Sequence, residues 1–188
     1  MADGLRSRER CLYSATSAAE LDHFRHALRQ IGVEALTEEE RGALLMVTCE
    51  ETHLAGGTFD SERMLRMLND GVESALNAGF VGLRACGDMS WLVEHPAGAE
   101  QCLEYEAILN SFFRGLRALG MCQYNRARLP PTTLDGALAT HPTVTVGGGV
   151  TTNMFYRPSG SGVTLPASSG DVDWKIRKLQ RQAVSGAR

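Results

Sequence analysis

Three side chains that can bind or orient a small molecule lie close together in the stretch GLRACGDMSW, residues 82–91. Arg84 and Asp88 share one face of the expected strand, because side chains on a strand alternate between its two faces. Trp91 follows shortly after the strand ends. These residues can line a ligand pocket, or Arg84 can form a structural ion pair with Asp88 while Asp88 caps the next segment. The residues alone leave both interpretations open.

Glu106 is unusual because it falls within the apolar face of a helix expected over about 99–119. A carboxylate that faces a core is costly unless it meets a cation or hydrogen-bond donors. Arg84 is a possible cation for it. The sequence therefore predicts that Glu106 belongs to a buried ion pair, which we favour, or to a polar pocket. The apolar face itself comprises Cys102, Tyr105, Leu109, Phe112, Phe113 and Leu116.

Cys122 and His141 are residue types that bind metal ions. Cys122 lies at the start of a strand expected over 121–125 and His141 lies just before the following strand. Both are therefore expected at one edge of the sheet, opposite the edge that holds Asp88. Two ligands without a close third or fourth are a weak zinc pattern. A buried thiol and a loop-capping histidine beside Pro142 are favoured instead, and neither a metal nor another cofactor is expected.

The common catalytic motifs do not occur in the sequence. It contains no GxxxxGK[ST] phosphate loop, no GxSxG elbow and no HExxH pair. The stretch GGGVTTN, residues 147–153, has glycines without the required spacing or lysine, so it is expected to form a tight turn. The chain is therefore not expected to be an enzyme. A metal-dependent enzyme that uses Cys122, His141 and an acid is the least favoured hypothesis.

The elements that must position these residues alternate between strands and helices. Such alternation predicts a single three-layer α/β domain with a largely parallel sheet, in which ligands bind beyond the carboxyl ends of the strands. The expected strands cover residues 10–15, 43–49, 82–88 and 121–125, with two more in 142–156. Helices are expected after Ser17 and Asp60, which can cap them, and over about 99–119 and 133–140.

The last part of the chain differs in composition from the rest. The expected domain covers residues 1–157, and residues 158–170 are rich in Gly, Ser and Pro and read as a linker. Residues 171–188 form a basic helix and tail, with apolar side chains at helical spacing. This helix is expected to dock on the domain or to begin a coiled coil.

Composition limits the function classes further. The 188 residues are 43% hydrophobic and carry a net charge of −3, so neither nucleic acid nor a membrane is expected as a direct partner. Five widely spaced cysteines without a CxxC pair favour a reducing compartment. The N-terminus lacks a signal-peptide pattern, and a cytoplasmic location is expected.

Several motifs together resemble those of the MEDS domain, the sensory domain of methanogen and methylotroph signalling proteins and of the dichloromethane regulator. The resemblance covers most of residues 4–156, although Asp88 stands where glutamate is common in the family. Family members usually begin with a further strand and helix that this chain lacks. The residues that carry the resemblance are Arg84, Asp88, Met89, Ser90, Trp91, Tyr105, Glu106, Asn110, Cys122, Tyr124, His141, Pro142, Asn153 and Tyr156.

The resemblance implies a RecA/KaiC-like fold without a phosphate-binding loop and a sensory role in prokaryotic signal transduction or transcription control. The ligand would be a small hydrocarbon derivative, and the signal would pass to a kinase, an anti-sigma or a DNA-binding module, or to a second copy. The alternative is an interaction protein without a ligand, whose partner completes its sheet. The expected ligand-binding residues are Arg84, Asp88, Trp91, Tyr105, Glu106, Tyr124 and Asn153.

Overall fold

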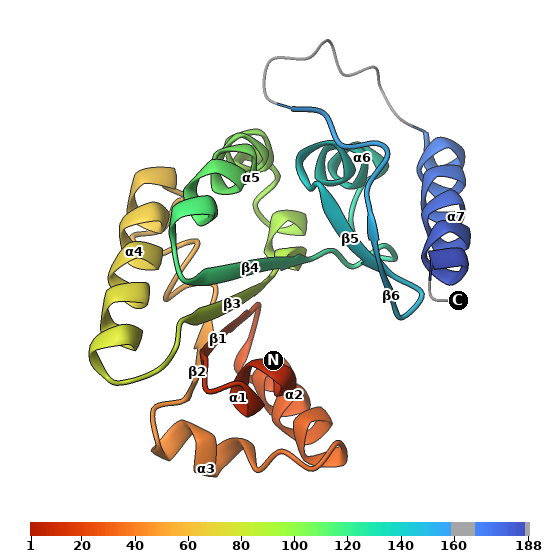
Figure 1. Ribbon diagram of the computed structural model, residues 1–188. Coiled ribbons are helices and arrows are strands. Elements are labelled where there is room, and N and C mark those ends of the chain that lie inside the picture. The colour runs from red at the N-terminus through yellow and green to blue at the C-terminus, as the bar shows by residue number, and fades with distance from the viewer. Residues whose placement is uncertain (159–167, 187–188) are drawn as a thin grey trace.

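A four-stranded, all-parallel sheet forms the centre of the molecule (Figure 1). The computed structural model describes residues 1–158 and 168–186. The strands lie in the order β2-β1-β3-β4, and each pairs directly with its neighbour. This arrangement confirms the predicted α/β class. The strands are β1 (Arg10–Ala15), β2 (Leu44–Thr48), β3 (Leu83–Asp88) and β4 (Ala118–Gln123).

Helices cover both faces of this sheet and complete the predicted three layers (Figure 1). On one face, α4 and α5 pack against the sheet through a core that includes Met64, Leu68 and Tyr105. On the other face, α1 and α2 pack against β1, while α3 leads into β2. The bounds are α1 (Ala2–Arg6), α2 (Ala18–Gln30), α3 (Ala35–Glu40), α4 (Ser61–Asn77) and α5 (Ala99–Phe112).

The segment between α5 and β4 differs from the sequence prediction. The helix ends at Phe112, one 3-10 turn follows over Phe113–Gly115, and the strand already begins at Ala118. Gly120, which the sequence predicts to end the helix, lies inside β4, where a Cβ atom would collide with the Phe113 ring. Cys122 is consequently the last residue but one of its strand. It lies at the same sheet edge as Asp88, so the expectation of opposite edges was wrong.

A smaller group of elements follows β4 in the chain (Figure 1). An antiparallel hairpin turns at Gly147 and Gly148, both of which have positive φ, as the three glycines predicted. The last helix packs on this hairpin and on α6, so it docks rather than extends away. Residues 159–167 of the predicted linker lie outside the described residues. The elements are α6 (Pro131–Thr140), β5 (Thr143–Val146), β6 (Gly149–Thr152) and α7 (Ser169–Gly186).

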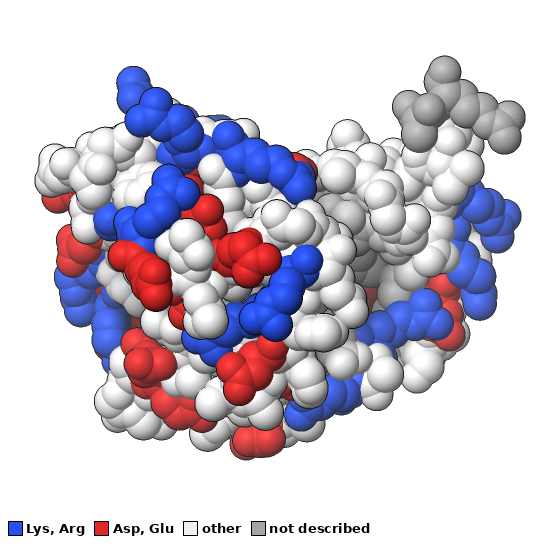
Figure 2. Space-filling view, turned by 90° about the horizontal axis from the view of Figure 1, so that it is seen from below, with Lys and Arg blue, Asp and Glu red and all other residues white. Residues whose placement is uncertain are grey.

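Basic and acidic side chains are interspersed on the face that Figure 2 shows. Charges also pair near the N-terminal helices: Arg25 of α2 lies 2.8 Å from Glu39 of α3, and Arg41, which follows α3, lies 3.0 Å from Glu38. All five cysteines are free. Within the described residues, no helix combines the length and the apolar character needed to cross a membrane.

Candidate functional site

The parallel register divides the predicted site between the two faces of the sheet. Gly87 pairs with Cys122 in β4, and by alternation these residues face α4 and α5. Arg84 and Asp88 face the opposite layer, which contains α1 and α2. The sequence assigns Arg84 and Asp88 to the same pocket as Glu106. The structure separates them by the thickness of the sheet.

Arg84 pairs with a residue that the sequence did not single out. Its Nε atom donates to Glu9 Oε2 at 2.5 Å, and this partner raises the pKa of the Arg84 guanidinium. Arg84 therefore forms neither of the ion pairs that the sequence left possible, with Asp88 or with Glu106. The pair instead joins β3 to the residues between α1 and β1, and the side chain lies against Gly4.

Asp88 caps the segment that follows β3. Its Oδ1 accepts a hydrogen bond from the Ser90 backbone N–H at 2.9 Å, at the start of a 3-10 helix over Met89–Val93. Burial raises the pKa of Asp88, and the neighbouring Glu20 adds to this effect. The pKa of Glu20 is lowered, chiefly by the hydroxyl of Thr16 that donates to it. Of the two interpretations left open, the contacts of Asp88 are those of a structural cap.

Trp91 packs within the core between two aromatic rings. The ring centroids lie 5.5 Å from His53 and 5.6 Å from Phe59, and only 2% of Trp91 is exposed. The indole Nε1 is buried and has no hydrogen-bond partner among the described residues. Trp91 is therefore a core residue that packs against the His53 ring, whereas the sequence predicted that it borders an open pocket.

A cavity of about 50 Å³ lies between the sheet and the two helices α4 and α5. Two of the predicted ligand-binding residues, Tyr105 and Glu106, line it. The wall is mostly apolar, with a few polar groups near the carboxyl ends of the strands. Its apolar side chains include Leu12, Met64, Met67, Leu68, Ala85, Met89, Leu109 and Phe113, and its polar ones include Ser14, Thr52 and His53.

The polar wall of this cavity contains a short hydrogen-bonded chain. Ser14 Oγ and Thr52 Oγ1 lie 2.8 Å apart, and Thr52 Oγ1 lies 3.2 Å from His53 Nδ1. Burial lowers the pKa of His53 to about 4, so its imidazole is neutral at neutral pH. Thr52 and His53 follow soon after β2 ends, and this position beyond a parallel strand was the signal that could have identified them.

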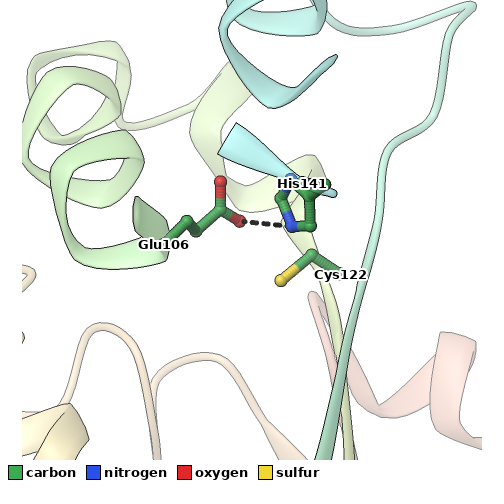
Figure 3. A group of neighbouring side chains, drawn as sticks. All are labelled: Glu106, Cys122 and His141. Atoms are coloured by element: carbon green, nitrogen blue, oxygen red, sulfur yellow. Dashed lines mark ion pairs between the residues drawn. The ribbon is translucent and has the colours of Figure 1, made fainter. Parts of the chain in front are cut away.

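Glu106 is buried on α5, and its carboxylate has two neighbours from other parts of the chain, of which Figure 3 shows His141. The Tyr124 hydroxyl donates to Oε1, and His141 Nε2 lies 3.9 Å from the same oxygen. The second oxygen, Oε2, is buried without a hydrogen-bond donor among the described residues. The predicted polar surroundings of Glu106 are therefore present, but they consist of Tyr124 and His141 and not of Arg84.

Cys122 completes a group of three metal-binding residue types. Its Sγ atom, a carboxylate oxygen of Glu106 and a ring nitrogen of His141 all lie within 4.8 Å of one another. Figure 3 shows the three side chains converging from α5, from β4 and from the end of α6. Burial and the nearby Glu106 charge raise the pKa of the Cys122 thiol. The sequence indicated Cys122 and His141 as a possible pair, without Glu106.

The backbone around His141 is held by several side-chain hydrogen bonds. The His141 ring nitrogen Nδ1 lies 2.8 Å from the Ala137 carbonyl oxygen, and the other ring nitrogen, Nε2, faces Glu106. Asn153 donates to the His141 carbonyl oxygen at 2.7 Å, and Asn110 donates to that of Thr140 at 2.7 Å. Asn153 is not among the residues that line the cavity; it holds the backbone of His141, and its role in ligand binding stays a prediction.

The fold and this site define a three-layer α/β domain with a small cavity next to a cluster of buried polar groups. A family scan matches residues 1–142 to the MEDS domain, described as the methanogen/methylotroph, DcmR sensory domain. The chain belongs to this family. Searches of curated proteins and of solved structures give no match.

Proposed function

We propose that this chain is a cytoplasmic, non-enzymatic sensory module that binds a small organic molecule in the cavity between the sheet and α4 and α5. The observation that supports this proposal is the cavity itself, which has a largely apolar wall and a few fixed polar groups. Such a combination is typical of small-molecule sites. Membership of a sensory family supports the same role.

The size of the cavity limits the ligand. A cavity needs a volume of roughly 10–15 Å³ to hold one water molecule. The cavity of about 50 Å³ therefore holds only a few groups of that size. A molecule with one or two carbons, such as a short alcohol or a halogenated methane, matches this volume. The neutral His53 and the Ser14–Thr52 pair offer hydrogen bonds to a hydroxyl or halogen-bearing group without introducing a charge.

The position of the cavity provides a route for the signal. α5 lines the cavity with Tyr105 and Glu106 and also packs against α6, which contacts α7. A ligand that displaces α5 would therefore shift elements at the surface. We propose that a kinase, an anti-sigma or DNA-binding module, or a second copy of the chain reads this shift by contact.

Methionine-methyl NMR tests this proposal, because Met64, Met67 and Met89 line the cavity. Addition of dichloromethane or methanol should shift these resonances in a saturable way and leave Met154, which is 49% exposed, unchanged. The Ala85→Leu variant, which fills the cavity, should abolish the shifts while the fold is retained. Shifts that are absent in the natural chain, or that survive in Ala85→Leu, would contradict ligand binding in this cavity.

One observation favours the alternative, an interaction protein without a ligand. β4 is an edge strand, and its residues Leu119 and Met121 are 42% and 39% exposed. The unpaired backbone groups of an edge strand can pair with a partner's strand, and exposed apolar side chains on that strand add contacts to it. Concentration-dependent association that Leu119→Lys abolishes, together with unshifted methionine resonances, would select this alternative.

A further inference from the structure

We propose that Glu106, Cys122 and His141 bind one divalent cation of the zinc class. The site goes beyond the sensory proposal and does not depend on it. Its three ligands would be a carboxylate oxygen of Glu106, the Cys122 thiolate and His141 Nε2, with a fourth coordination position left open. Glu106 and Cys122 also line the cavity, so the open position is accessible from that side.

The donor set is the first support for this proposal. Nitrogen, thiolate sulfur and carboxylate oxygen are the ligands that zinc takes in proteins, and three protein ligands with an open position are common at functional zinc sites. The three donors come from α5, β4 and the end of α6, which are distant in the sequence. The fold, and not a local turn, therefore brings them together (Figure 3).

The second support is an unsatisfied buried acceptor. Glu106 is 2% exposed, and its Oε2 atom has no hydrogen-bond donor within the described residues. Buried polar atoms in folded proteins nearly always have a partner, because an unpaired one loses its hydration without compensation. A bound cation between Glu106 and its neighbours would supply the missing partner.

The third support is the orientation of His141. Its Nδ1 lies 2.8 Å from the Ala137 carbonyl oxygen, and a proton on Nδ1 leaves the Nε2 lone pair directed at Glu106. Metal-binding histidines in proteins usually donate their second ring nitrogen in this way, which fixes the tautomer. The Asn153 bond to the His141 carbonyl oxygen then holds the residue in place.

The distances require only a small adjustment. In a tetrahedral zinc site the donor atoms lie roughly 3.3–3.6 Å from one another. His141 Nε2 and Glu106 Oε1 are 3.9 Å apart, and all three donors are within 4.8 Å. Side-chain rotations that move the donor atoms by about 1 Å would close the site around a cation at the usual ligand distances without moving the backbone.

The charges also balance. Cation binding replaces the Cys122 proton, which passes to solvent, so that one thiolate, one carboxylate and one neutral imidazole surround a double positive charge. The net charge of the occupied site is zero, which reduces the cost of burial. With Glu106 ionised and His141 neutral before binding, the Cys122 thiol proton is the one that is lost, so about one proton is released per cation bound.

Cobalt and zinc titrations of the chelator-treated 188-residue chain test the site. One equivalent of Co²⁺ should give thiolate-to-cobalt charge-transfer absorption and intense visible bands typical of four-coordination, and Zn²⁺ should displace it. Zn²⁺ addition in weak buffer with a pH indicator should release about one proton from the natural chain. This last measurement needs no variant, so it remains decisive if a ligand substitution impairs folding.

The variants locate the site. Cys122→Ser should remove the charge-transfer band. His141→Ala should weaken zinc binding by more than about 100-fold, because a loss of about 10–100-fold is typical of residues that only hydrogen-bond to a metal ligand. The matched controls are Cys11→Ser, a buried cysteine on β1, and His26→Ala, a surface histidine on α2. The proposal would be overturned if the natural chain bound no stoichiometric cation, or if Cys122→Ser and His141→Ala both bound zinc as tightly as the natural chain. Either result would leave the methionine test of the organic ligand unaffected.

Discussion

Asn153 donates a hydrogen bond from Nδ2 to the carbonyl oxygen of His141 at 2.7 Å. The same Nδ2 donates to the Leu138 carbonyl oxygen at 2.6 Å, and Oδ1 accepts from the Phe155 backbone N–H at 2.9 Å. One buried amide thus joins the chain after β6 to the end of α6. This relationship explains why a residue outside the sheet can matter to a site beside it.

Asn153→Ala removes these three side-chain hydrogen bonds and leaves two carbonyl groups without their donor. Each net bond contributes about 0.5–1.5 kcal/mol, so we expect the free energy of unfolding to fall by about 2–4 kcal/mol in urea titrations. Asn69→Ala, which removes a surface bond to Glu73 at 3.2 Å, is the control and should cost less than about 0.5 kcal/mol. Equal losses would show that Asn153 has no special structural role.

Tyr124→Phe removes the hydroxyl that donates to the buried Glu106 carboxylate. Hydrogen bonds to a charged partner contribute about 1.5–3 kcal/mol, and we expect a loss of that size in the free energy of unfolding. Tyr13→Phe is a matched control, because the Tyr13 hydroxyl donates to the neutral Gln123 amide at 3.3 Å. Its loss should be only about 0.5–1.5 kcal/mol. A larger loss for Tyr13 than for Tyr124 would contradict the charged hydrogen bond.

The buried His53 predicts a specific dependence of stability on pH. Its pKa is lowered from 6.5 to about 4 by burial, so between these values the unfolded chain binds a proton that the folded chain does not. Stability is then lost as the pH falls from 6.5 to about 4, by at most about 3 kcal/mol. His53→Gln should remove this part of the acid destabilisation, and His26→Gln on the surface should not. Urea titrations near neutral pH and near pH 4 measure how much stability each variant loses on acidification. If His53→Gln and His26→Gln showed the same pH dependence, His53 would not be the source of the acid destabilisation.

The alternation of strands and helices was predictable because its signals are local. Asp60 accepts a hydrogen bond from the Arg63 backbone N–H at 2.9 Å, and Ser17 accepts one from that of Glu20 at 3.3 Å, as their capping positions predicted. The period of two also placed Arg84 and Asp88 correctly on one face of β3.

The partners across the fold were not predictable in the same way. Which helices cover a given face of the sheet depends on connections between distant elements, so the Arg84 pair with Glu9 could not be read from strand periodicity. The same limit concealed the meeting of Glu106 with Cys122. The sequence alone does not distinguish a glycine that ends a helix from one that packs beneath an aromatic ring. It predicts that Gly120 ends a helix, although Gly120 lies in β4 beneath Phe113, and Cys122 is therefore expected at the wrong end of the strand.

The capping role of Asp88 can be separated from its charge by two substitutions. Asp88→Asn keeps an oxygen that accepts from the Ser90 N–H, whereas Asp88→Ala loses it and should cost about 1 kcal/mol. Because burial raises the pKa of Asp88 in the folded state, its contribution to stability is present below the unfolded pKa and is lost as pH rises through the folded pKa. Asp88→Asn should therefore gain stability relative to the natural chain as the pH rises through this window. Equal stabilities of the alanine and asparagine variants would contradict the cap.

Gly120→Ala tests the placement of β4 that brings Cys122 to Glu106. In an ordinary strand, alanine is favoured over glycine by roughly 0.5–1 kcal/mol, because glycine loses more conformational freedom on folding. At Gly120 the added Cβ would collide with the Phe113 ring, so we expect a destabilisation of about 1–3 kcal/mol. Gly115→Ala is the control, since no heavy atom outside its immediate chain neighbours lies within 4 Å of the place that its Cβ would take. If Gly120→Ala stabilised the protein, Gly120 would not lie beneath Phe113, and Cys122 would lose the position that lets it face Glu106.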